Sequence, residues 1–165
     1  MFETILVAIG ANLPTTDGAS PLATCQRAVG KLAAIPGLRL SRVSRWFATR
    51  PIPASDQPDF VNGVASLGGT IDPVDLLAAL HGIEAAAGRI RAGPDGARTL
   101  DLDLLAMDGL IVAAPALTLP HPRLQDRAFV LRPLLDVLPG WRHPLSGRTV
   151  EVLLGDVSTQ VIEPL

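Results

Sequence analysis

Two helix starts, each placed after a strand-like segment, constrain the fold of this chain more than any other feature. Ser20-Pro21 and Asp72-Pro73 each combine an N-cap side chain with a first-turn proline, whose missing N–H is harmless at that position. Apolar residues then recur at three- and four-residue steps, until Pro36-Gly37 in the first segment and Gly88 in the second. The sequence therefore predicts two amphipathic helices.

Strand-like segments surround these helices. Apolar and β-branched residues fill 3–9, and similar patterns mark 38–47, 60–71 and 98–107. The order strand, helix, strand, strand, helix, strand is that of the split βαβ arrangement. It predicts an α+β, ferredoxin-like βαββαβ core, with an antiparallel sheet and both helices on one face. Cys25 falls on the apolar stripe of the first helix, so we expect a core thiol.

The C-terminal third predicts an extension of this core. We expect a short hairpin over 104–113, a proline-bounded turn, a helical piece over 128–137 and a capped helix near 149–154. No domain boundary, repeat or low-complexity linker is visible. Residues 1–165 are therefore expected to form a single domain.

Composition and charge exclude several classes of protein. Hydrophobic residues make up 48% and charged residues 18%, unlike a disordered chain. The apolar runs are shorter than the roughly 20 residues that span a bilayer, so we expect no membrane segment. Glu3 and the absence of Lys or Arg before the first apolar run argue against a secretory signal, which makes the cytoplasm the expected location. With a net charge of −2, the chain lacks the excess of basic residues that is typical of nucleic-acid-binding proteins, so we expect no nucleic-acid partner.

Asp101 and Asp103 are the first candidate site residues. In the strand-like segment RTLDLDLL, a period of two places both carboxylates on one face, with their Cβ atoms about 7 Å apart. Two carboxylates at this spacing suit Mg²⁺, which keeps waters and phosphate oxygens as its other ligands. The alternative is an ordinary solvated strand face.

Basic residues occur both before and after this acidic pair in the sequence. Arg89 and Arg91 follow the second helix, Arg98 opens the acidic strand, and His121 and Arg127 lie in the later turn. Acids for a metal beside guanidinium groups for an anion are typical of a metal–nucleotide site. Surface ion pairs are the alternative for each arginine, and a structural role is the alternative for the histidine. Because the chain has no Walker or Rossmann glycine motif, a nucleotide must be held in another way.

Five ordered blocks carry a resemblance to a known family. They are IGANL at 9–13, the segment from Thr49 through DQPDFVN at 56–62, IEAAAGRIR at 83–91, RTLDLDLL at 98–105 and LPHPRLQDRAFVLRPL at 119–134. Together they resemble the 6-hydroxymethyl-7,8-dihydropterin pyrophosphokinases of folate biosynthesis. The resemblance implies transfer of the pyrophosphoryl group of ATP, the co-substrate, to the pterin hydroxymethyl oxygen, with release of AMP. Both substrates are small molecules, and we expect a monomer.

The resemblance also implies roles for single residues. Asp101 and Asp103 match a pair that holds two Mg²⁺ ions. The implied catalytic set is Asp101, Asp103, Arg89 and Arg98. The implied ATP-binding set is Arg89, Arg91, Arg98, His121 and Arg127. The implied pterin-binding set is Thr49, Ile52, Phe60, Asn62 and Phe129, in which Asn62 reads the polar edge and the two phenylalanines sandwich the ring. Glu84 is expected to support the site from behind.

Some residues depart from the family pattern, and some questions stay open. Pro53 stands where relatives commonly have glycine, and the loop 92–97 is shorter and lacks a tryptophan, so lid closure is expected to differ. The proton acceptor is either Asp103 or water. The alternative functions are a γ-phosphoryl transferase that releases ADP and a non-catalytic binding module for nucleotide or single-stranded RNA.

Overall fold

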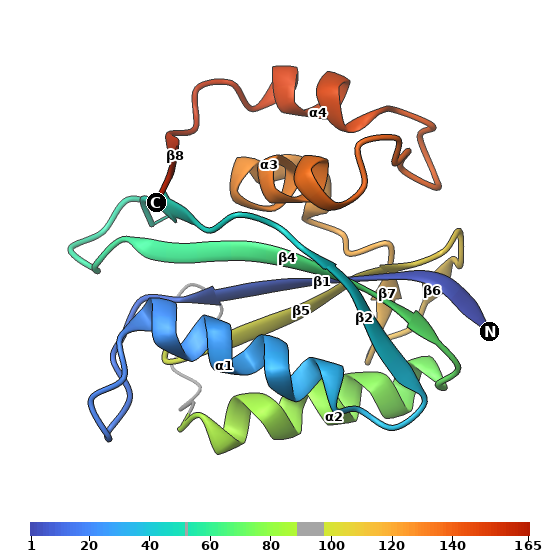
Figure 1. The fold of residues 1–165 in the computed structure, drawn as a ribbon. Coiled ribbons are helices and arrows are strands. Elements are labelled where there is room, and N and C mark those ends of the chain that lie inside the picture. Colours follow the sequence, from blue (N-terminus) through green and yellow to red (C-terminus); the bar gives the residue numbers. More distant parts are fainter. Residues whose placement is uncertain (52, 89–97) are drawn as a thin grey trace.

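An antiparallel sheet forms the centre of the computed structural model (Figure 1). The structure describes residues 1–51, 53–88 and 98–165. β1 (Phe2–Ala11) lies between β4 (Phe60–Gly69) and β5 (Asp101–Met107). The other side of β4 pairs with two successive strands, β2 (Leu38–Val43) and β3 (Phe47–Thr49). Within the described residues, β5 therefore forms one edge of the sheet.

Two helices cover one face of this sheet, as Figure 1 shows. α1 (Pro21–Ala33) and α2 (Pro73–Ala86) start where the sequence predicted. Ser20 Oγ accepts a hydrogen bond from the N–H of Ala23 at 3.1 Å, and an Asp72 carboxylate oxygen caps α2 in the same way. The core below the sheet includes Ile5, Val7, Ile9, Cys25, Leu32, Leu67, Leu76, Leu80, Leu102 and Leu104. Cys25 is fully buried, which confirms a core thiol.

Two further helices cover the opposite face (Figure 1). α3 (Ala128–Val137) and α4 (Val150–Asp156) occupy segments where the sequence predicted helices. The core between them and the sheet includes Leu6, Val64, Leu105, Leu124, Leu131, Leu134, Trp141, Val150 and Leu153. A turn of 3-10 helix, η1 (Leu124–Asp126), precedes α3. The sheet therefore lies between two helical layers, and the mixed α/β architecture with an antiparallel sheet is confirmed.

The expected hairpin over 104–113 is wrong. β5 continues to Met107 against β1, and the chain then turns at Asp108, whose φ is +47°. The hairpin forms later, between β6 (Val112–Ala113) and β7 (Thr118–Leu119). At the outer edge of β5, the carbonyl of Leu105 accepts the N–H of His121 at 2.8 Å, so a later segment of the chain occupies the place that the expected hairpin partner would take.

The strand expected at 38–47 is interrupted, and a terminal strand was not predicted. At the interruption, Ser44 Oγ accepts the hydrogen bond from the N–H of Val64 at 2.9 Å, so a side chain replaces a backbone partner. β8 (Ile162–Pro164) pairs with β3 near the end of the chain. None of the described helices is long and apolar enough to cross a membrane.

Candidate active site

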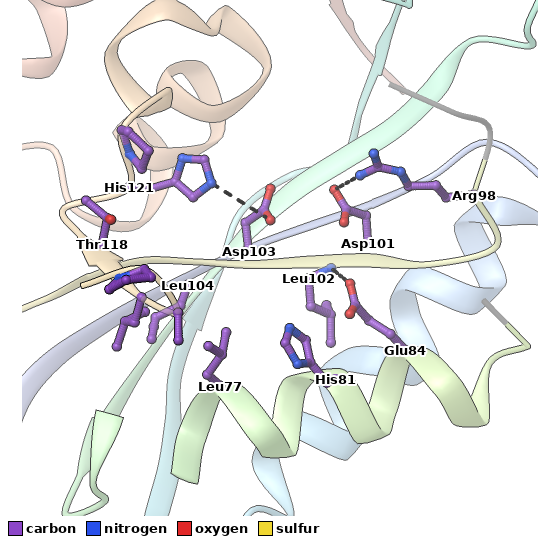
Figure 2. Close-up of a pocket in the computed structure, with 14 residues that line it drawn as sticks. Leu77, His81, Glu84, Arg98, Asp101, Leu102, Asp103, Leu104, Thr118 and His121 are labelled. Atoms are coloured by element: carbon purple, nitrogen blue, oxygen red, sulfur yellow. Dashed lines mark hydrogen bonds and ion pairs between the residues drawn. The ribbon is translucent and has the colours of Figure 1, made fainter. Parts of the chain in front are cut away.

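The two acidic residues of β5 share one face of the sheet. Leu102 and Leu104 point into the core on the α2 side, whereas Asp101 and Asp103 point to the opposite side, toward His121 (Figure 2). The period of two in the sequence predicted this arrangement. Because β5 is an edge strand of the described sheet, the carboxylates lie beside open space, where a ligand can approach.

Each carboxylate has a basic neighbour from another segment. Arg98 Nη1 lies 3.0 Å from Asp101 Oδ2. His121 Nε2 lies 4.0 Å from Asp103 Oδ1, and Arg127 Nη1 lies 3.9 Å from Asp103 Oδ2. The two distances at Asp103 exceed those of ordinary hydrogen bonds. The structure thus brings together the five described residues that were predicted to bind phosphate or metal: Arg98, Asp101, Asp103, His121 and Arg127.

Burial and like charge make Asp103 an unusual carboxyl. Burial, followed by the charge of Asp101, raises the pKa of Asp103 to about 7, while Arg127 opposes the rise. Burial and then the charge of Arg127 lower the pKa of His121. His121 Nδ1 accepts the N–H of Arg123 at 3.1 Å, so the neutral ring carries its proton on Nε2, toward Asp103. Because burial and the charge of Asp101 disfavour the ionised form of Asp103, a positive charge bound beside the two carboxylates would stabilise that form.

The acidic pair fits Mg²⁺ better than a metal that needs a closed cage of protein ligands. Among residues 1–51, 53–88 and 98–165, no cluster of three or more His, Cys, Asp or Glu side chains could hold a metal ion. Mg²⁺ is commonly held by one or two carboxylates, with phosphates and waters completing its shell. Burial and then the charge of Asp101 raise the pKa of Asp103, and a cation bound by the two carboxylates would offset both effects.

Glu84 supports this pair from the other side of β5. Its side chain is 3% exposed and belongs to α2. Glu84 Oε2 accepts the N–H of Leu102 at 2.9 Å (Figure 2). The bond fixes the peptide group between the two acids, which agrees with the supporting role expected from the sequence.

A pocket of about 280 Å³ opens beside the acids (Figure 2). Besides Glu84, Arg98, Asp101, Asp103 and His121, it is lined by Leu77, His81, Leu102, Leu104, Pro115, Ala116, Leu117, Thr118 and Pro122. The sequence analysis gave no role in the site to His81, Leu77 or Thr118. His81 lies one helical turn before Glu84, a spacing that could have placed it beside the site.

A second group of predicted residues lies across the sheet. Asn62 Nδ2 donates to Thr49 Oγ1 at 2.6 Å, and both side chains are buried. Phe60 shares the face of β4 with Asn62 and is half-buried. Phe129, at the start of α3, is also half-buried, and the Arg127 guanidinium carbon lies 5.3 Å from its ring centroid. The polar and aromatic residues expected for a flat heterocycle therefore occur on the α3 side of the sheet.

Strand register connects the two groups. Gly10 of β1 pairs with Asp101 on one side and with Asn62 on the other. Directly paired residues point to the same face, and two strand spacings amount to about 10 Å. A Cβ on Gly10 would lie only 2.7 Å from Asn62 Oδ1. We call Asp101, Gly10 and Asn62 the cross-sheet row; because its central residue has no side chain, there is room for the Asn62 amide beside β1.

Asn12, which the sequence analysis gave no role, joins two loops at the site. Its side chain is 1% exposed. Asn12 Nδ2 donates to Gln57 Oε1 and to the carbonyl of Pro58, each at 3.1 Å. Asn12 Oδ1 accepts the N–H of Arg98 at 2.8 Å. Asn12 thus ties the loop before β4 to the segment that carries Arg98, and its place within IGANL was the available signal.

Part of the predicted site lies outside the described residues. This holds for Ile52, Arg89, Arg91 and the loop 92–97.

Comparisons with known proteins identify the family of this chain. The family model for 7,8-dihydro-6-hydroxymethylpterin-pyrophosphokinase matches residues 6–139. A 2-amino-4-hydroxy-6-hydroxymethyldihydropteridine pyrophosphokinase of Pseudomonas aeruginosa is 41% identical over 100% of this chain and 98% of its own length. A protein of the same name from Synechocystis sp. is 37% identical over 97% of this chain and 79% of its length.

Solved structures show the same fold. The wild-type HPPK-DHPS of Plasmodium falciparum superposes with a TM-score of 0.71 over 96% of this chain, at 12% identity. The chain spans 45% of that longer protein. On the strength of the family match and the full-length relatives, the chain belongs to the 7,8-dihydro-6-hydroxymethylpterin-pyrophosphokinase family of ATP-dependent diphosphotransferases.

Proposed function

We propose that this protein transfers the pyrophosphoryl group of ATP to the hydroxymethyl oxygen of 6-hydroxymethyl-7,8-dihydropterin, giving the pterin diphosphate and AMP, as a step in folate biosynthesis. The cross-sheet row carries the proposal. It sets an acidic group suited to metal and phosphate about 10 Å from a buried amide, with a glycine between them. In fold terms, β1–β5 with α1 and α2 form a ferredoxin-like core, with β2 and β3 as one interrupted strand, and α3 and α4 are its C-terminal extension.

The amide end of the row suits the pterin. Thr49 Oγ1 takes one hydrogen of the Asn62 Nδ2 group, which leaves the other N–H and Oδ1 as an adjacent donor and acceptor. That pair matches the alternating donors and acceptors along the edge of a pterin. The half-buried rings of Phe60 and Phe129 supply faces on which a flat heterocycle can stack.

The acidic end suits a metal–triphosphate. Asp101 and Asp103 would hold two Mg²⁺ ions, which when bound neutralise phosphate charge and polarise the phosphorus that is attacked. Arg98, Arg127 and His121 supply donors for phosphate oxygens, and the adjoining pocket accepts the nucleoside. Arg89 and Arg91 are proposed to add phosphate contacts.

The reaction is a displacement at the β-phosphorus of ATP. The pterin hydroxymethyl oxygen forms a bond to this phosphorus and gives its proton to Asp103 or to water, while the bond to the oxygen that bridges the α- and β-phosphates breaks. AMP leaves with that electron pair. The chain's own contribution is positioning, since Asn62 fixes the pterin and the basic groups beside Asp103 hold the phosphates and stabilise the charge that develops on them.

The experiment combines purified protein, ATP, Mg²⁺ and the hydroxymethyl pterin, and separates the products by chromatography. AMP and pterin diphosphate in equal amounts, formed only when all components are present, are the expected result. ADP instead of AMP would refute the proposal in favour of γ-phosphoryl transfer, and no nucleotide consumption would favour a binding module. Asp101→Asn should be inactive, whereas Asp59→Asn, at an exposed aspartate in the loop before β4, should keep wild-type activity.

A further inference from the structure

The last residues of the chain contact both halves of the candidate pterin site. We propose that residues 160–165 act as a strap and that Gln160 is a positioning residue for Arg127 and Phe129. This inference rests on the proposed function. The strap lies beyond residues 6–139, which the family model matches, so the family match gives it no role.

Gln160 holds the start of α3 with both ends of its side-chain amide. Its Oε1 accepts the N–H of Ala128 at 2.9 Å, and its Nε2 donates to the carbonyl of Asp126 at 2.8 Å. The N-cap residue of α3 is Arg127, whose side chain contains no acceptor with which to cap a helix. Gln160, which lies 32 positions after Ala128 in the sequence, therefore supplies the cap.

The two hydrogen bonds bracket the backbone of Arg127. Its guanidinium Nη1 lies 3.9 Å from Asp103 Oδ2, and its guanidinium carbon lies 5.3 Å from the ring centroid of Phe129. The side chains of Arg127 and Phe129 therefore extend from a stretch of backbone that Gln160 holds in place. A displacement of about 1 Å at groups that position a substrate can cost on the order of 100-fold in rate.

The other end of the strap holds the opposite wall of the site. β8 pairs with β3, with Ile162 opposite Thr49, and the N–H of Leu165 donates to the carbonyl of Trp46 at 3.0 Å. Thr49 is the partner of the Asn62 amide. Because Gln160 and Ile162 are two residues apart, the strap fixes the spacing between the start of α3 and the strand that orients Asn62.

The test compares Gln160→Met, which keeps the side-chain length but removes both hydrogen bonds, with Thr159→Ala at the exposed neighbouring residue. In Gln160→Met we expect faster hydrogen exchange at the Ala128 amide and a fall of about tenfold in kcat/KM for the pterin, at temperatures where the protein stays folded. Thr159→Ala should match the wild type. Gln160→Glu keeps the acceptor for Ala128, so it should restore protection of that amide and part of the activity.

The outcomes separate this inference from the proposed function. Wild-type protein that releases no AMP would overturn both. An active wild type together with a folded Gln160→Met variant of unchanged kcat and pterin KM would overturn the strap alone. The strap would also be overturned if the loss of activity in Gln160→Met merely tracked the unfolded fraction.

Discussion

Replacing Asp103 with asparagine should stabilise the metal-free protein at alkaline pH while it lowers kcat by at least about 100-fold. Burial, and then the charge of Asp101, raise the pKa of Asp103 from 3.8 to about 7. Between these values the native protein holds a proton that the unfolded chain has released. The contribution of Asp103 to the free energy of unfolding is therefore most favourable at acidic pH, and it falls as pH rises from about 4 through about 7.

The size of the effect follows from the same numbers. The rise in pKa from 3.8 to about 7 corresponds to at most about 4 kcal/mol, at about 1.4 kcal/mol for each pKa unit. Because 28% of the Asp103 side chain is exposed, water screens part of this cost, and we expect about 2 kcal/mol. Asparagine is neutral at every pH, so the variant should lack this component.

Urea unfolding at pH 5 and pH 8, with a chelator present, measures the effect. Because the unfolded carboxyl is already ionised at pH 5, only part of this cost falls between these two pH values. The wild type should therefore lose about 1 kcal/mol more than Asp103→Asn. Asp59→Asn should follow the wild type, and Mg²⁺ at pH 8 should stabilise the wild type more than the Asp103 variant. Parallel pH dependences of the wild type and Asp103→Asn would refute the reasoning.

Three other substitutions test separate parts of the site. Gly10→Ala should displace the Asn62 amide and raise the KM for the pterin about tenfold, with little change in the KM for ATP; equal changes in both would contradict a role of Gly10 in making room for that amide. Glu84→Ala should lower the free energy of unfolding by about 1–3 kcal/mol, because it leaves a buried N–H unpaired on β5; a loss within error of zero in urea unfolding would count against this. Hydrogen bonds from arginine lower the pKa of Asp136 against the opposing effect of burial, so Asp136→Asn should destabilise the protein at pH 7 by about 1 kcal/mol. Its difference from the wild type should shrink as pH falls below about 4, and a difference that stays constant down to pH 3 would disprove the link.

The sequence predicted the elements that depend on local chemistry. Ser20 and Asp72 cap helices through their own neighbours, so the helix starts can be identified without knowledge of the fold. Asp101 and Asp103 share a face because a strand has a period of two. The sequence grouped His121 and Arg127 with Asp103 only by residue type and through the family resemblance. No local pattern predicts that the turn before α3 lies against β5.

The features that were missed depend on distant partners. Ser44 interrupts a strand because its side chain bonds to β4, and β8 exists because β3 has an edge to pair with. Asn12 and Gln160 each act through backbone groups more than 30 residues away, on either side of the site. A hydrogen-bonding side chain of this kind carries no periodic signal, and only the packed structure identifies its partners.

The buried thiol has a practical consequence for following this protein in solution. Cys25 is the one cysteine of the chain and is fully buried, and burial raises its pKa to about 12. A thiolate is the form that reacts with maleimide dyes, so the natural sequence is already an inert background for labelling. A Ser55→Cys variant would place one fluorophore on an exposed position of the loop that Asn12 tethers. Changes in its emission would then report on loop movement during turnover without prior replacement of the native cysteine.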